Sequence, residues 1–524
     1  MQFKYTKFAS ALLATGLLSL PYSANANDST ELEELRGLVQ ELSQQVKVLA
    51  RKGEINEETV AAEKKAAPVV KASSSGFSFG SADGKNEIKF RGLVQADHRH
   101  YSEGSRDIRG RSNARAGNLD ENGFADSGDT SLLRRVRPTI EGKLLGKYGF
   151  RFTPEFAGGS ASAVDAYIDA NFNSAFNIRA GKFKSFVGLE RLQGGGNIKF
   201  LERSYVTNAI LPNRDLGAAI HGDLLGKKLN YAVGIVNGVA DGGNISTGAE
   251  FNDEREYTAR LFATPFKDDD SALAGLGFGI GATYTDFKGE RNLNYTDTSA
   301  ADATRNGLPS YVTDGQNTFF RYGSAAVADG KRFRFSPQAN YYNGPLGIIA
   351  EYAKVYQDVS LTGGGSSSGG GGGGNTTFTP NTNKTLNHDA WQIAGSYLLT
   401  GEDASFGSVK PKQDFDLDKG GWGAWELVAR YSEINLDDDT FKNPTNNQYS
   451  GGYADLANSA KSAESWTAGI NWYWNQNVKL AVNYTQTSFE GGASSNNANA
   501  NATGSNIRDR DDEKALLARF QVAF

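Results

Sequence analysis

Positively charged side chains alternate with apolar ones through much of this chain. In one segment, Arg135 and Arg137 alternate with Val136 and Ile140. Strict alternation is typical of a β-strand with one apolar face and one wet face, so such cations share the wet face. Cations along a narrow aqueous passage concentrate anions, and the planar guanidinium of arginine matches the oxygens of phosphate. The pattern therefore predicts a row of cations that attracts anions.

Cations recur on this face in both halves of the sequence, at Lys89, Arg91, Arg99, Arg135, Arg137, Lys143, Arg151, Arg179, Arg260, Arg332, Arg334, Arg430, Lys479 and Arg519. The net charge of the chain is −5, so the basic face reflects placement and not composition. A negative chain also argues against a general nucleic-acid binder. Acidic residues such as Glu141, Glu155 and Asp165 share the same face. A second interpretation therefore stays open, in which the cations only solvate a mixed lumen.

The elements that must position these cations are strands. Alternation begins near Glu87 and continues to the terminal Phe524. No apolar run after residue 20 approaches the ~20 residues of a membrane helix, whereas a barrel strand needs an apolar residue only at every second position. Short and long links largely alternate along the chain, as turns and loops do in outer-membrane barrels. We predict an all-β fold, a transmembrane antiparallel β-barrel of about 16 strands, over residues 87–524.

One long link, residues 188–215, is a candidate functional loop. It contains Arg191, Lys199, Arg203 and Arg214 and three successive glycines at 194–196. Its apolar side chains are too numerous for a loop exposed to water. Two placements agree with the sequence. The loop folds into the lumen, with mobility at its glycines, or it packs over the rim or at a subunit contact.

Three segments precede the barrel. Residues 1–26 have the basic start, short apolar run and small-residue cleavage site of a signal peptide. Residues 27–52 carry an a/d heptad seam, Leu32, Leu35, Val39, Leu42, Val46 and Leu49, which predicts a self-associating coiled-coil helix in the periplasm. A helix folded onto its own domain is the alternative. Residues 53–86 lack a periodic face and predict a flexible linker.

Three stretches resemble the phosphate-selective porins O and P. They read RRVRPTIEGKLLGKYGFRFTPEF at 134–156, VDAYIDANF at 164–172 and IRAGKFKSFVGLER at 178–191. The resemblance implies a sixteen-stranded homotrimer with an inward third loop and a basic constriction. Carried onto this chain, it implies that the anion meets Arg135, Arg137, Lys182, Lys184, Arg191, Lys199 and Arg203. The strand pattern adds Arg91, Arg151 and Arg179 to the expected pore lining.

The expected function is a porin of the Gram-negative outer membrane that passes small hydrophilic solutes by diffusion, with a preference for inorganic phosphate or other small anions. The expected contacts are membrane lipid and lipopolysaccharide, with no nucleic acid and no cofactor or metal. An enzyme is disfavoured because the chain has four histidines and no cysteine, and no serine motif stands beside a histidine. A general-diffusion porin without anion specificity and a structural or adhesive membrane protein are the alternatives.

Overall fold

The structure is a computed structural model that describes residues 28–103, 128–245, 253–289, 306–361, 382–447, 449, 451–494 and 507–524. The chain divides into two compact units, Met1–Ala67 and Pro68–Phe524. The predicted signal peptide over residues 1–26 lies outside the described residues and stays a prediction.

The first unit contains one long helix, α1 (Asp28–Ala66), of 39 residues. It continues past residue 52, where the heptad pattern predicted its end. Residues 54–66 are mostly Glu, Ala and Lys, which are strong helix formers, and Pro68 prevents continuation. All six residues of the heptad seam are exposed. Within the described parts of the chain, α1 and the shorter helices lack a stretch long and apolar enough to cross a membrane.

A hairpin occupies part of the predicted linker. β1 (Val69–Ser73) pairs with β2 (Gly76–Gly80), and β2 pairs with the first residues of β3 (Glu87–Glu103). The prediction of a structureless linker over 53–86 is therefore wrong for most of its length. The terminal Phe524 exchanges backbone hydrogen bonds with Gly92, so the last strand leaves the start of β3 unpaired. β2 covers that free edge, which explains its local order.

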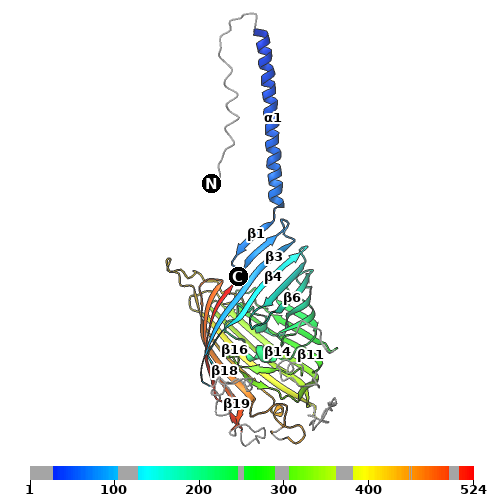
Figure 1. Cartoon of the computed structure of the whole chain (residues 1–524), viewed down its shortest axis with the longest axis vertical. Coiled ribbons are helices and arrows are strands. Elements are labelled where there is room, and N and C mark those ends of the chain that lie inside the picture. The colour runs from blue at the N-terminus through cyan, green and yellow to red at the C-terminus, as the bar shows by residue number, and fades with distance from the viewer. Residues whose placement is uncertain are drawn as a thin grey trace. The chain divides into compact units, whose positions relative to one another are not determined.

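The second unit is a closed antiparallel barrel of 16 strands, as predicted (Figure 1). After β3 its strands are β4 (Thr130–Leu144), β5 (Tyr148–Glu155), β6 (Ser162–Asn171), β7 (Asn177–Lys184), β8 (Arg214–Leu224), β9 (Leu229–Val236), β10 (Glu256–Ala263), β11 (Leu276–Lys288), β14 (Ala326–Asn343), β15 (Leu346–Leu361), β16 (Lys384–Leu398), β17 (Ala424–Asn435), β18 (Ala460–Tyr473), β19 (Val478–Ser494) and β21 (Glu513–Ala523). β21 pairs with β3, for example Leu517 with Arg99, and closes the barrel.

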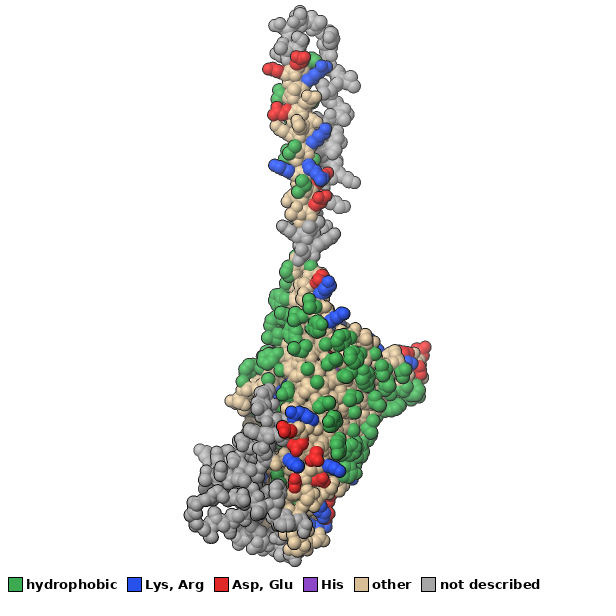
Figure 2. All heavy atoms as spheres, turned by 90° about the vertical axis from the view of Figure 1, so that its right-hand side faces the viewer, with side chains coloured by type: hydrophobic (Ala, Val, Ile, Leu, Met, Phe, Trp, Pro, Cys, Tyr) green, Lys and Arg blue, Asp and Glu red, His purple; other side chains and the backbone are tan. Residues whose placement is uncertain are grey.

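The last strand has the predicted arrangement, with apolar side chains on the outer face and charged side chains facing the lumen. Leu516 and Phe520 are exposed on the outer face, whereas Arg519 and Gln521 are buried inside. Figure 2 shows hydrophobic side chains covering much of one face of the barrel, with Lys, Arg, Asp and Glu gathered toward its lower end. Apolar side chains thus face outward and charged side chains face the lumen, as expected for a membrane barrel.

Long links fill much of the lumen. Loop 3 (residues 185–213) joins β7 to β8 and holds α2 (Leu189–Leu192) and the π-helix η2 (Val206–Ile210). Loop 5 (residues 289–325) joins β11 to β14 and holds a small hairpin, β12 (Ser310–Val312) and β13 (Thr318–Arg321). The remaining short elements are η3 (Ala272–Gly275), η4 (Asp438–Thr440) and β20 (Ile507–Asp509).

Candidate functional site: a basic constriction inside the barrel

Loop 3 lies inside the barrel, so the inward placement is the right one of the two that the sequence allowed. Its buried apolar residues are Val187, Leu189, Ile198, Phe200, Leu201, Tyr205, Val206, Ala209, Ile210 and Leu211. Leu201 packs against Ala481, Ala515 and Leu517 of the inner wall. The backbone N–H of Leu201 donates to Asn483 Oδ1 at 2.8 Å. Apolar burial and wall hydrogen bonds together hold the loop across the lumen.

The glycine segment of loop 3 is pinned to the wall. Gln95 Nε2 donates to the carbonyl of Gly195 at 3.0 Å, and Gln521 Nε2 donates to that of Gly196 at 2.9 Å. A Cβ on Gly195 would lie 3.4 Å from Leu93 Cδ2, which is van der Waals contact. A Cβ would therefore fit there, and it is the two hydrogen bonds from Gln95 and Gln521 that hold the glycine segment at the wall, where the sequence suggested mobility.

Glu202 is the ionic anchor of loop 3. Its Oε1 accepts from Arg134 Nε at 2.6 Å and from Arg99 Nη2 at 3.1 Å, and Arg519 Nη2 lies 3.8 Å away. Burial alone would raise the pKa of Glu202, but Arg134 and the neighbouring arginines hold that pKa far below its usual value. The carboxylate therefore stays charged and ties the loop to β3, β4 and β21.

Seven cations gather where loop 3 approaches β4, β7 and β8. We call Arg134, Arg135, Arg137, Lys184, Arg191, Arg203 and Arg214 the eyelet cluster. The charge of Arg203 acts on Lys184 and on Arg135. The charge of Arg214 acts on Arg137 and on Arg191. The cluster is thus one electrostatic unit, although its members come from β4, the end of β7, loop 3 and the start of β8.

Carboxylates neutralise three members of the cluster directly. Arg134 pairs with Glu202, Arg137 Nε lies 2.5 Å from Glu155 Oε2, and Arg214 Nε lies 2.9 Å from Asp165 Oδ1. Among the described residues, no carboxylate lies within 4.0 Å of the other four members, which are Arg135, Lys184, Arg191 and Arg203. The cluster therefore carries an excess of positive charge.

Neutral acceptors hold the four unneutralised cations. Lys184 Nζ and Arg203 Nη2 donate to the same carbonyl, that of Gln193, at 2.8 and 2.7 Å. Arg191 donates to the carbonyl of Thr207, and Arg135 Nη1 donates to Gln95 Oε1 at 2.6 Å.

Both Arg135 and Arg191 keep a buried Nε–H without a partner among the described atoms. Burial, opposed by Glu190 and reinforced by Arg214 and Arg137, lowers the pKa of Arg203 to about 10, so Arg203 remains charged at neutral pH. Unfilled N–H donors on charged groups are the features that an entering anion would use.

The alternation of residue types did not predict that Arg134 points into the lumen. The register of β3 and β4 shifts between Gln95 and Ala96, which leaves Arg134 as the extra residue of a β-bulge. The bulge turns Arg134 inward, onto Glu202, alongside Arg135. Two successive arginines in an otherwise alternating strand are the sequence signal that could have revealed it.

Comparison with known proteins decides the family. The profile described as "Phosphate-selective porin O and P" matches residues 107–524, well over half of the chain. The chain belongs to this porin family. A curated relative, Porin O of Pseudomonas aeruginosa, is 22% identical over 442 residues, which cover 80% of this chain and 87% of the relative.

Solved structures with a similar fold were also found. The outer membrane channel DcaP of Acinetobacter baumannii matches with a TM-score of 0.49 and 12% identity, over 86% of this chain and 100% of that one. An anion-selective porin from Comamonas acidovorans matches with a TM-score of 0.45 and 12% identity, over 84% of this chain and 100% of that one. By its family, this porin is a channel of the outer membrane.

The porin places two predicted site residues outside the eyelet cluster. Lys182 Nζ donates to the carbonyl of Ile245 at 2.6 Å. Lys199 Nζ lies 3.0 Å from Glu426 Oε1, on another part of the wall. The other five positions taken from the family resemblance, Arg135, Arg137, Lys184, Arg191 and Arg203, come together in the cluster.

The three pore-lining arginines predicted from strand alternation lie nearer the short-turn end of the porin. Arg91 Nη1 and Arg151 Nη1 each lie 3.1 Å from Glu141, and Arg179 pairs with Asp169. These pairs make the inner surface at that end a mixture of both charges and not a purely basic ladder.

Two further segments of the porin reach loop 3 from inside the barrel. The Tyr205 ring meets the Phe319 ring of loop 5 edge-on, with centroids 5.9 Å apart. Gln193 Nε2 donates at 2.9 Å to the carbonyl of Phe406, in the link between β16 and β17. The inward position of residues 306–322 of loop 5 was not predicted from the sequence. Apolar residues such as Tyr311 and Phe320 in so long a loop are the signal that could have shown it.

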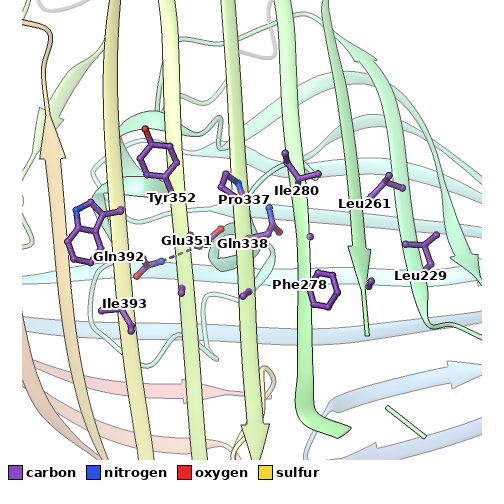
Figure 3. Close-up of a pocket in the computed structure, with 15 residues that line it drawn as sticks. Leu229, Leu261, Phe278, Ile280, Pro337, Gln338, Glu351, Tyr352, Gln392 and Ile393 are labelled. Carbon is purple, nitrogen blue, oxygen red and sulfur yellow. Dashed lines mark hydrogen bonds between the residues drawn. The ribbon is translucent and has the colours of Figure 1, made fainter. Parts of the chain in front are cut away.

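The outer wall of the porin carries a hollow of about 810 Å³ that is unrelated to this site. Exposed apolar side chains such as Leu261, Ile280 and Ile393 line it (Figure 3). Behind them, on the lumen side, Gln392 Nε2 donates to Glu351 Oε2 at 3.1 Å, the bond that is dashed in Figure 3. An apolar hollow on the lipid face offers nothing to a hydrophilic solute.

Proposed function

We propose that this outer-membrane channel favours small hydrated anions, inorganic phosphate among them, and that the eyelet cluster selects them. The observation that carries the proposal is a set of four cations that have no carboxylate within ion-pair distance among the described residues: the buried Arg135, Arg191 and Arg203 and the half-buried Lys184. Positive charge in a narrow passage with low-dielectric walls attracts anions and repels cations. The passage needs no covalent step and no energy source.

The same cluster explains how an anion could bind and still leave. The free Nε–H groups of Arg135 and Arg191 can each donate a charge-assisted hydrogen bond to a phosphate oxygen. Lys184 and Arg203 already donate to a carbonyl, so they contribute charge more than new bonds. Moderate binding of this kind suits conduction, which requires that the solute enter and also depart.

A general-diffusion porin without anion specificity is the second candidate. It is favoured by the paired charges at the short-turn end, where Arg91 and Arg151 share Glu141 and Arg179 meets Asp169. In that case the mixed charges of the inner surface would affect ion selectivity more than the local excess of positive charge in the eyelet cluster.

Planar-bilayer recording separates the two candidates. The reversal potential in a potassium chloride gradient is expected to show anion preference, and added phosphate is expected to reduce the chloride current. The double variant Lys184→Gln and Arg203→Gln should lower both effects by several-fold. Lys331→Gln, on the outer face, is the matched control and should leave both unchanged. Cation preference and no phosphate block in the wild type would reject the proposal.

We infer that the channel is a homotrimer with α1 in the periplasm. The strands β5, β7, β9 and β10 have 8 residues each. Eight residues tilted by about 40° rise roughly 20 Å, less than the apolar belt of about 25 Å that lipid requires. A neighbouring subunit that packs against these short strands would shield them from lipid. Pairing with the α1 helices of the other subunits would cover the exposed heptad seam. The connection of α1 to β1 supports a periplasmic location, because the turn after β1 contacts a short turn of the barrel, and short turns face the periplasm in such barrels.

A further inference from the structure

We propose that Asp314, at the tip of the inward hairpin of loop 5, is a positioning residue that holds loop 3 at its constricting position. Loop 5 would then act as a latch on loop 3, and the steadiness of the channel current would depend on a residue outside the eyelet cluster. This inference rests on the channel function and not on the preference for anions.

The tip of loop 5, residues 313–317, is tied to a distant part of the barrel wall. Asp314 Oδ2 accepts from Arg430 Nη2 of β17 at 2.7 Å and from Thr467 Oγ1 of β18 at 2.8 Å. The carbonyl of Gly315 accepts from Arg99 Nη1 of β3 at 3.1 Å and from the Tyr101 hydroxyl at 2.6 Å. Loop 5 starts between β11 and β14, so its tip has crossed the lumen.

The two arginines that bind this tip also bind loop 3. Arg430 Nη1 donates to the carbonyl of Glu202 at 2.9 Å, and its guanidinium lies 4.6 Å from the centroid of the Phe200 ring. Arg99 Nη2 donates to the Glu202 carboxylate at 3.1 Å. Each arginine is thus a bridge between the tip of loop 5 and the anchor residue of loop 3.

Charge makes Asp314 the critical side of this bridge. Its carboxylate lies 2.7 Å from Arg430, whereas the other carboxylate near Arg430, that of Glu190, is 3.6 Å away. Without Asp314, the buried guanidinium of Arg430 would keep, among the described residues, only that longer ion pair. A buried charge without a close partner reorients toward water or another acceptor, which would release the Glu202 carbonyl.

Single-channel recording of the full chain tests the proposal. Asp314→Ala is expected to show several-fold more current noise, with excursions to larger conductance, while the reversal potential stays as in the wild type. Asp314→Asn keeps the shape and hydrogen-bonding capacity and should show a smaller increase. Asp438→Ala is the matched control, because Asp438, in the link between β17 and β18, pairs with Lys442 of the same link and with Lys461 at the start of β18; its current noise should stay as in the wild type.

A reversible tether distinguishes latching from general loosening of the fold. A Cβ on Gly196 would lie 3.5 Å from the Cβ of Ala523, a separation that suits a disulfide, and the chain has no other cysteine. In Asp314→Ala, the pair Gly196→Cys and Ala523→Cys should restore a quiet current when oxidised and lose it when reduced.

Two results would overturn the proposal. One is a steady, wild-type current from both Asp314 variants, and the other is noise that persists with the tether closed. If Asp314→Ala fails to assemble, the same comparison of current noise with the disulfide oxidised and reduced is made with Asp314→Asn combined with Gly196→Cys and Ala523→Cys. A failure of anion preference in the wild type would leave this test unaffected.

Discussion

Glu202 shows how single residues of this porin serve position as well as charge. Its carboxylate meets Arg99, Arg134 and Arg519, which come from β3, β4 and β21, so one loop residue ties together the first and last strands of the barrel. Three of the four unneutralised cations, Lys184, Arg191 and Arg203, donate to carbonyls of the loop that Glu202 holds. Charge selection and loop position are therefore coupled at this residue.

Replacement of Glu202 by Gln should destabilise the folded barrel. Removing one partner of a buried ion pair costs about 3–5 kcal/mol, because the remaining charges stay buried. The variant should also shift the reversal potential toward stronger anion preference. The measurement is the temperature at which the folded barrel converts to its unfolded form on a gel. Glu490→Gln, on the exposed outer surface, is the control and should change little; equal stability of the two variants would contradict the assigned role.

The pH dependence of stability should report the same residue. The folded-state pKa of Glu202 is held below its unfolded value of about 4.3, so its contribution is present above that value and is lost as pH falls through the folded pKa. The difference in unfolding temperature between the wild type and Glu202→Gln should therefore stay constant from pH 7 to about pH 5. It should shrink only in more acidic solution. A difference that vanishes near pH 6 would show that the carboxylate is not held by the arginines.

At the scale of elements, the inward loops support one another. Loop 3 contacts loop 5 through Tyr205 and Phe319, and it contacts the link after β16 through Gln193 and Phe406. The link between β9 and β10 adds a further contact, because Gly242 lies against the backbone of Asn208 in loop 3. Each loop is too short to form a core alone, so the lumen becomes their shared core.

Gly242→Ala should disturb this shared core. Gly242 has a φ of +67°, and a Cβ there would lie 2.0 Å from the backbone oxygen of Asn208. Gly226 has nearly the same φ, +65°, with nothing within 4 Å. Gly226→Ala should therefore show the conformational cost alone, about 1–2 kcal/mol. Gly242→Ala should cost clearly more and broaden the single-channel current, and equal unfolding temperatures for the two variants would count against the packing between the loops.

At the scale of the whole molecule, two surfaces have no partner among the described residues. The residues of the heptad seam of α1 are all exposed, and the short strands leave one side of the barrel wall low. The proposed trimer would pair the helices and cover the low side of the wall.

Changing the seam should weaken that trimer. Leu35→Asp with Leu42→Asp places charges on the apolar seam of α1, so the trimer should dissociate at lower temperature and lower protein concentration. The measurement is the mass of the detergent-solubilised chain by light scattering. Glu34→Gln with Glu41→Gln changes charge off the seam and is the control. An unchanged trimer in the seam variant would place the association entirely in the barrel.

Much of the architecture was predictable because alternation is a local property. The outward placement of Leu516 and Phe520, the inward placement of Arg519 and the count of 16 strands follow from parity and link length. Short or irregular features escaped prediction. Arg134 turns inward through a bulge, the hairpin β1–β2 has strands of only 5 residues, and α1 continues beyond its heptads.

The alternation of residue types was enough to predict that apolar and charged side chains take opposite faces of a membrane barrel, because neighbouring residues of a strand must point in opposite directions. Which cations are neutralised depends on contacts that form only in the folded barrel. Arg137 and Arg203 have the same charge and both lie in the eyelet cluster, yet Arg137 meets Glu155 and Arg203 meets carbonyls. Those partners come from segments distant in the chain, and their approach depends on the packing of the whole lumen.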